Sequence, residues 1–104
     1  MAVRKPTSLV FEREENQGRY ELAQNYPNPF NAKTVISYFL PKSSHVELSI
    51  FSITGQKIKT LVQEHQVQGR YSYEWNASHY ASGIYIYRLA ADSFVRSNKL
   101  LVAK

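Results

Sequence analysis

The sequence has no cysteine and a single aspartate, Asp92, among its 104 residues. Without cysteine, the chain can form no disulfide, no cysteine-ligated zinc site and no thiol nucleophile. Asp92 lies between two predicted strands, and no Gly-x-Ser-x-Gly segment occurs, so a hydrolytic triad is not expected. These absences exclude several common classes of enzyme.

Long apolar runs are also missing, and a membrane-spanning helix would need about 20 consecutive apolar residues. The first residues lack the apolar stretch of about 7–15 residues that marks a secretory signal peptide. We therefore expect either a cytoplasmic protein or a piece of a longer exported one.

The formal net charge is +5, but basic residues do not gather into a stripe. Residues 1–21 hold four basic and four acidic groups, and residues 22–104 hold nine dispersed basic groups against four acidic ones. A surface that follows a phosphate backbone normally needs clustered lysine and arginine. We expect no nucleic-acid partner.

Short runs rich in Val, Ile, Tyr, Phe and Thr alternate with glycine and proline, which indicates strands separated by turns. No segment keeps the apolar spacing of an amphipathic helix over three turns. Strands are predicted at 34–40, 45–52, 57–62, 70–75, 84–91 and 94–104, with a short one around Leu22. Seven short strands predict an all-β fold, an Ig-like antiparallel sandwich of two sheets.

Within these runs, apolar and polar residues alternate with a period of two, as in strands buried on one face. In 70–75 the inward positions are Tyr71, Tyr73 and Trp75. In 57–62 the apolar residues lie three apart, which favours a β-bulge. We therefore assign most aromatic rings to the core and leave Tyr80 and Phe51 as candidates for an exposed patch.

Two connections have chemical reasons for their shape. Gly55 can adopt the positive φ that a tight reversal requires. The segment 25–31 cannot enter a sheet interior, because its prolines donate no hydrogen bond to a ladder. We predict a rigid corner in which Tyr26 and Phe30 pin the loop onto the core, with contributions from Asn25, Pro27 and Pro29.

No constellation in the sequence predicts catalysis, a metal or a cofactor. His45 is placed at the start of a strand, and His65 and His79 are placed in loops, too scattered to act together. The glutamates at positions 12, 14 and 15 have the composition of a solvated linker and lack the spacing of a calcium loop. We therefore predict that the chain is not an enzyme, and that it holds no metal and no cofactor.

Several sequence motifs, taken in their order along the chain, resemble those of a known protein family. Residues 22–31 read Leu-Ala-Gln-Asn-Tyr-Pro-Asn-Pro-Phe-Asn, and 82–89 read Ser-Gly-Ile-Tyr-Ile-Tyr-Arg-Leu. With Thr-Gly-Gln-Lys-Ile at 54–58 and Lys-Leu-Leu-Val at 99–102, these occur in the order found in type A C-terminal sorting domains of the bacterial type IX secretion system. The pattern also resembles the Ig-like domain of the flagellar hook-cap protein.

The resemblance implies a non-catalytic domain at 22–104 that directs an upstream cargo in the same chain across the outer membrane. Residues 1–21 would be a linker, with a possible edge strand at 8–11. The implied partners are the outer-membrane secretion machinery and a sortase-like protease. The protein would be exported, to the cell surface or the medium, and the domain would be monomeric.

We expect the end of the last strand to be recognised, in part by strand addition to its edge. The candidate residues for this recognition are Gly83, Tyr85, Arg96, Lys99, Leu101, Val102 and Lys104. An alternative is an accessory Ig-like module of a secreted enzyme, either carbohydrate-binding or a structural spacer.

Overall fold

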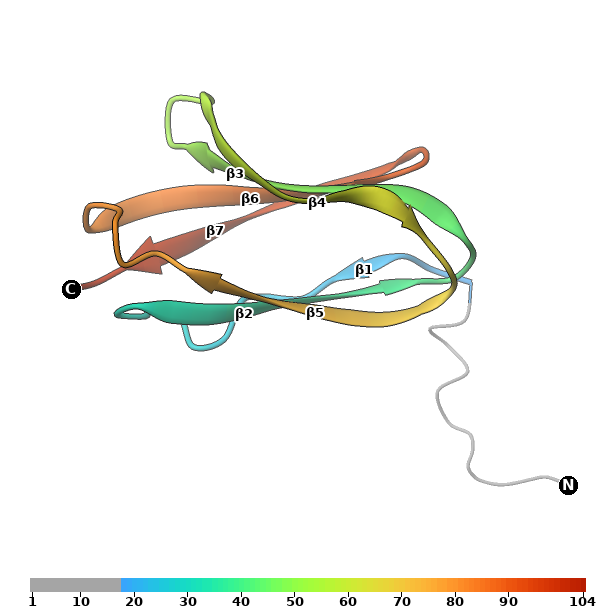
Figure 1. Ribbon diagram of the computed structural model, residues 1–104, viewed down its shortest axis with the longest axis horizontal. Coiled ribbons are helices and arrows are strands. Elements are labelled where there is room, and N and C mark those ends of the chain that lie inside the picture. The colour runs from blue at the N-terminus through green and yellow to red at the C-terminus, as the bar shows by residue number, and fades with distance from the viewer. Residues whose placement is uncertain (1–17) are drawn as a thin grey trace, which may run out of the picture.

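The computed structural model describes residues 18–104, which form seven β-strands in an elongated two-layer sandwich (Figure 1). The strands are β1 (Glu21–Leu22), β2 (Lys33–Leu40), β3 (Ser44–Ser52), β4 (Lys57–Gln66), β5 (Gly69–Asn76), β6 (Gly83–Ala91) and β7 (Phe94–Val102). Within this part of the chain, no helix is long and apolar enough to cross a membrane. The predicted all-β sandwich is confirmed.

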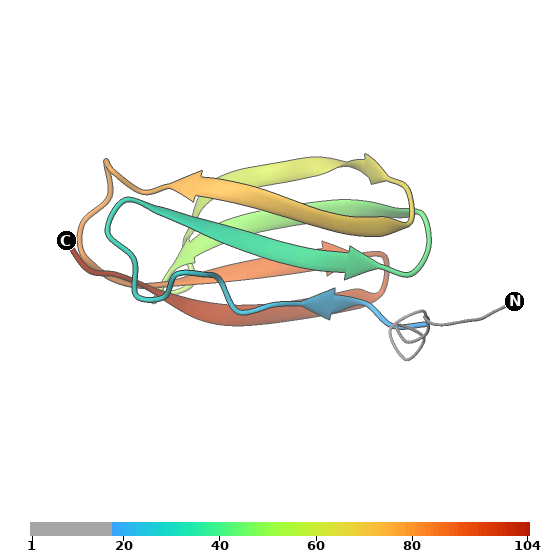
Figure 2. The same cartoon turned by 90° about the horizontal axis from the view of Figure 1, so that it is seen from below.

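The two sheets differ in width. One has three strands in the order β1-β2-β5, and the other has four in the order β4-β3-β6-β7. All neighbouring strands are antiparallel. The chain crosses between the sheets from β2 to β3, from β4 to β5 and from β5 to β6, which is the connectivity of Ig-like sandwiches. Figure 2 shows the three-stranded sheet in front of the four-stranded one, with the strands of both sheets running roughly along the long axis of the domain.

The core lies between the sheets and is built by the predicted alternation. In β2, Ile36, Tyr38 and Leu40 are buried, while the residues between them are exposed or half-buried. Because successive side chains leave opposite faces of a strand, this pattern directs one set inward along the whole strand. The buried apolar side chains are Leu22, Phe30, Ile36, Tyr38, Leu40, Val46, Leu48, Ile50, Trp75, Ala77, Tyr87, Leu89, Ala91, Leu100 and Val102.

Strand β4 carries the irregularity that the sequence predicts. Its register against β3 shifts between Leu48 and Ser49 and again between Ile50 and Phe51. The strand is longer than predicted and continues to Gln66, so the placement of His65 in a loop is wrong. The ladder with β3 continues across these residues and pairs His65 with His45.

The first described residues are held against the sandwich. The Tyr20 ring stacks on Phe94 with 5.1 Å between ring centroids, and its hydroxyl lies 2.8 Å from Ser44 Oγ. These contacts anchor the chain just before β1. The possible edge strand at 8–11 and the glutamates of the predicted linker lie outside the described residues.

Candidate recognition surface at the C-terminal strand

Strands β6 and β7 form a hairpin that carries most of the predicted recognition residues. Their pairing is continuous from Gly83 opposite Val102 to Ala91 opposite Phe94. The reversal between them uses Asp92, whose φ of 54° lies in the left-handed region that aspartate tolerates better than most residues. The hairpin therefore fixes which side chains share a face.

The predicted residues divide between the two faces of this hairpin. Val102 is buried in the core, and Tyr85 lies opposite the buried Leu100 on the same inner face. Lys99 and Leu101 are exposed and, by alternation, lie on the outer face. The structure thus brings Lys99 and Leu101 together and separates them from the inner set.

Arg96 also lies on the inner side, because its cross-strand partner Leu89 is buried. Its guanidinium is 5.7 Å from the centre of the Phe94 ring, and it lines a shallow cavity of about 350 Å³ with Tyr20 and Leu22. Arg96 therefore belongs to the surface around β1, at the other end of β7 from Leu101.

Lys104 is tied to the loop between β5 and β6. Its Nζ donates to the carbonyl oxygen of Ser78 at 2.7 Å and to that of Tyr80, and its backbone N–H donates to Ser82 Oγ at 3.1 Å. The ammonium group therefore closes the chain end onto this loop.

The backbone edge of β7 is covered near its C-terminal end. Phe30 pairs in parallel with Val102, and its N–H donates to the Leu101 carbonyl at 3.0 Å. Asn28 Oδ1 accepts the Leu101 N–H at 2.9 Å, and Gln24 Nε2 donates to the Lys99 carbonyl at 2.9 Å. These backbone groups are already hydrogen-bonded, so this end of the β7 edge is not open to the strand addition that the sequence analysis expected.

The outer face of the hairpin carries an apolar patch that the sequence analysis did not assign. Ile84 is 44% exposed and lies directly opposite Leu101, which is 39% exposed. Ile86 and Lys99 form the next pair on the same face. We call these four residues the C-terminal patch. The signal was present in β6, where Ile84 and Ile86 alternate with Tyr85 and Tyr87 and leave neither face polar.

The predicted corner is held by a buried hydrogen-bond network. Asn25 N–H donates to the Tyr87 hydroxyl at 2.9 Å, and that hydroxyl donates to the Ala23 carbonyl at 2.6 Å. Asn25 Nδ2 donates to Thr34 Oγ1 at 2.9 Å. Burial raises the pKa of Tyr87, against a smaller lowering by its hydrogen bonds to Asn98 and Asn25. The network keeps the corner in register with β6.

The two aromatic residues of the corner differ. Phe30 is buried, with its ring 6.0 Å from that of Trp75, as predicted. Tyr26 is 79% exposed, so the prediction that it pins the loop onto the core is wrong. Its backbone pairs with Val35 in both directions, at 2.9 and 3.0 Å, which holds the loop without the ring. The peptide bonds preceding Pro27 and Pro29 are cis.

Two charged groups on the four-stranded sheet contact residues of neighbouring strands. Lys57 Nζ lies 2.5 Å from Glu47 Oε2, and this contact, with a hydrogen bond from Ser49, lowers the pKa of Glu47. The Arg88 guanidinium lies 4.4 Å from the centre of the Phe51 ring, so it partly covers that candidate aromatic.

Within residues 18–104, no group of three or more histidine or acidic side chains is placed to hold a metal ion.

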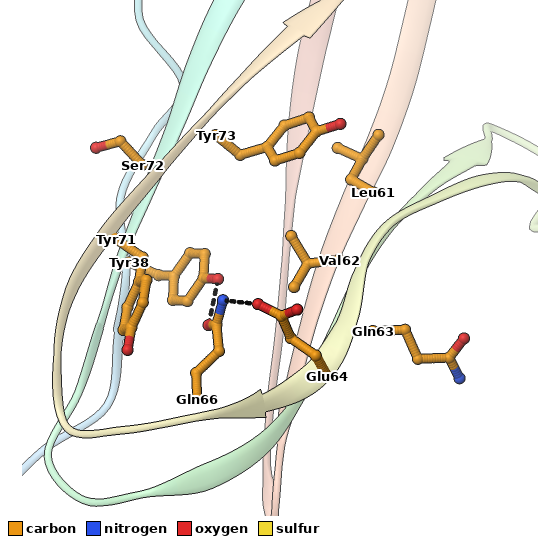
Figure 3. Close-up of a pocket in the computed structure, with 9 residues that line it drawn as sticks. All are labelled: Tyr38, Leu61, Val62, Gln63, Glu64, Gln66, Tyr71, Ser72 and Tyr73. Carbon is orange, nitrogen blue, oxygen red and sulfur yellow. Dashed lines mark hydrogen bonds between the residues drawn. The ribbon is translucent and has the colours of Figure 1, made fainter.

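A second concave surface lies between β4 and β5, on the side of the sandwich away from β7 (Figure 3). Its first cavity, of about 330 Å³, is lined by Tyr38, Leu61, Val62, Glu64, Gln66, Tyr71 and Tyr73, among others. Figure 3 shows the Tyr38 hydroxyl bonded to Gln66, whose amide continues to Glu64. Burial raises the pKa of Tyr38 to about 12.

The fold and these surfaces define an Ig-like β-sandwich module whose interaction chemistry lies in its sheet faces and strand edges. Residues 24–103 match the model of the secretion system C-terminal sorting domains. The chain therefore belongs to this family, the sorting domains of the type IX secretion system, as the resemblance predicted. Members of the family are generally non-catalytic. No curated protein matches the chain significantly.

Proposed function

We propose that this domain is a non-catalytic address that directs an upstream cargo in the same chain across the outer membrane by the type IX secretion system. The observation that carries the proposal is the family match, which extends over nearly the whole sandwich. Residues 22–104 form the address, and residues 1–21 link it to the cargo. A sortase-like protease then removes the domain, and the cargo reaches the cell surface or the medium.

The C-terminal patch is the part of the address that contacts the secretion machinery. Ile84 and Leu101 offer exposed apolar area, and Lys99 adds a positive charge beside them. Apolar residues next to a charge suit a partner surface that is apolar at its centre and acidic at its rim.

The remaining predicted residues support this patch from beneath or beside it. Gly83 and Val102 pair at the base of the hairpin, and Tyr85 donates from its hydroxyl to the Ala81 carbonyl at 2.7 Å. Lys104 holds the neighbouring loop. Arg96 contributes to recognition from the separate surface around β1.

Export of a reporter tests this role. The 104-residue chain is fused behind a fluorescent protein bearing an export signal and expressed in a bacterium that has a type IX system. Leu101→Asp breaks the apolar pair and neutralises Lys99, so we expect about tenfold less reporter outside the cell and its accumulation in the periplasm. Val95→Asp is the matched control, because Val95 lies on the same outer face of β7 and is 60% exposed.

The export test separates the sorting role of the domain from the contact made by the C-terminal patch. Wild-type export of the Leu101→Asp fusion, with the domain folded by circular dichroism, would show that the C-terminal patch is not the contact. Retention of the unmutated fusion in the periplasm would contradict the sorting role itself. Equal loss of export in the Val95→Asp control would point to a general effect of added charge.

A further inference from the structure

Long, regular strand edges invite another chain to pair with them, and natural sheets protect such edges. Three of the four edges in the described sandwich are protected over at least part of their length. Strand β1 has only two residues, and the C-terminal end of β7 is covered by the segment that contains Phe30. Strand β4 is interrupted twice and turns Lys59 and Glu64 toward the inner side, since they pair with the buried Ile50 and Val46.

Strand β5 has none of these protections. It pairs with β2 over eight residues in unbroken register and contains no proline. Ala77 N–H donates to the Ala32 carbonyl at 2.7 Å, so alternation points the backbone groups of Ser72 and Glu74 away from β2. No described strand pairs with β5 on that side.

Because no described strand lies beside β5 on its outer side, part of the four-stranded sheet opposite is left uncovered. The four-stranded sheet is one strand wider than its partner, and Leu61 and Val62 on β4 are only partly buried. Two cavities of about 330 and 320 Å³ lie along this side and share Tyr73. A fourth strand added beside β5 would lie beneath β4 and fill them.

We propose that the β5 edge binds an extended peptide segment of another protein as an added antiparallel strand. Its backbone would pair with Ser72 and Glu74, and alternate side chains would enter the groove between β5 and β4. Glu64 lines the cavity beside Tyr71, and Lys59 lines the cavity beside Trp75. The segment therefore carries an apolar residue at its centre, a basic residue toward Glu64 and an acidic residue toward Lys59.

Other occupants fit the groove less well. A second copy of the domain, paired through β5, would offer only the uncharged Tyr71, Tyr73 and Trp75 at its inward positions, and these form no ion pairs with Lys59 and Glu64. A saccharide needs an open aromatic face, whereas the Trp75 ring is buried and packs against Phe30 and Tyr80. The proposal does not depend on the sorting role.

Peptide titration followed by NMR of the full 104-residue chain tests the proposal. The probe is the heptapeptide Thr-Glu-Thr-Val-Thr-Lys-Thr, whose two charges stand four residues apart, about 13 Å in a strand. On binding, we expect amide exchange at Ser72 and Glu74 to slow by about tenfold or more, because their N–H groups gain acceptors. Binding without slower exchange at these two amides would overturn the proposal.

Two sets of variants separate backbone pairing from general effects. Ser72→Pro removes the outward N–H and should abolish binding, while Ser72→Ala keeps that N–H and should bind normally. Both substitutions remove the contact between the Ser72 and Ser37 hydroxyls, so the two variants differ in the backbone N–H and not in this contact. In the Lys59→Glu variant, a di-lysine version of the probe, with lysine in place of its glutamate, should bind about fivefold more tightly than the original, because the added lysine pairs with the new carboxylate at position 59.

The remaining outcomes are also decisive. If Ser72→Pro does not fold, amide exchange in the wild-type chain and the Lys59→Glu preference decide the question. No binding of the probe at millimolar concentration, or binding unaffected by Ser72→Pro, would contradict strand addition. Concentration-dependent dimerisation through β5 in sedimentation would replace the peptide with a second copy. Leu101→Asp should leave probe binding unchanged, so this test and the export test fail independently.

Discussion

At the residue scale, Tyr87 does more than fill the core. Its buried hydroxyl donates to the Ala23 carbonyl and accepts from Asn25 N–H and from Asn98 Nδ2, at 2.6, 2.9 and 3.1 Å. A buried hydroxyl with several partners fixes the relative position of the segments it joins. Tyr87 therefore joins β6 to the corner that covers β7.

Replacing Tyr87 by phenylalanine should lower the free energy of unfolding by about 2–3 kcal/mol, because the buried Asn25 N–H loses its acceptor. The control is Tyr85→Phe, which loses only the exposed hydrogen bond to Ala81 and should cost under about 1 kcal/mol. Urea denaturation of both variants measures the difference. Equal losses in the two variants would show that the network adds nothing.

At the element scale, the segment from Gln24 to Phe30 acts as a cover for β7. Its residues Asn28 and Phe30 hydrogen-bond to the N–H and the carbonyl of Leu101, and the buried Phe30 ring holds the segment in place. A strand end that would otherwise be open to other chains is closed from within the domain. The same segment carries the motif by which the sequence resembles the sorting family.

Phe30→Ala should release this cover and cost about 3–5 kcal/mol of stability, because a buried aromatic ring is lost. Amide exchange should accelerate most at Leu101 and Ala103, whose N–H groups bond to the segment. Tyr26→Ala, in the same loop, should change stability by less than about 0.5 kcal/mol, since its ring is exposed. Uniform acceleration across β7 would contradict a local cover.

At the scale of the whole molecule, two buried tyrosine hydroxyls make stability depend on alkaline pH. The pKa of Tyr38 is raised to about 12 from an ordinary value of 10.0, and that of Tyr87 is also raised, in both cases mainly by burial. At a pH between the ordinary and the raised pKa, the two tyrosines have lost their hydroxyl protons in the unfolded chain but keep them in the folded chain. The contribution of these two tyrosines to stability is therefore fully present below about pH 10 and is lost as the pH rises toward 12.

Denaturation at a series of pH values measures this decline. Tyr38 alone should account for at most about 3 kcal/mol of it, from two pKa units. Tyr38→Phe removes the ionisable group and should flatten the decline, although the variant also loses the 2.7 Å bond to Gln66. An unchanged slope in Tyr38→Phe would mean that another group unfolds the domain at high pH.

The sequence by itself determined the strands and the core, because the repeat of two in a segment such as 70–75 is a local property of the chain. It also indicated the bulge in β4 and the turn at Gly55, which has a φ of 96°. It failed where burial depends on distant contacts, as for the exposed ring of Tyr26 and the strand position of His65.

Only the tertiary structure decided which surfaces remain available. The cover over β7 joins Gln24 to Lys99, 75 positions away, and the free edge of β5 follows from the unequal widths of two sheets. Such contacts arise from packing between segments distant in the chain, and no local pattern of residues encodes them.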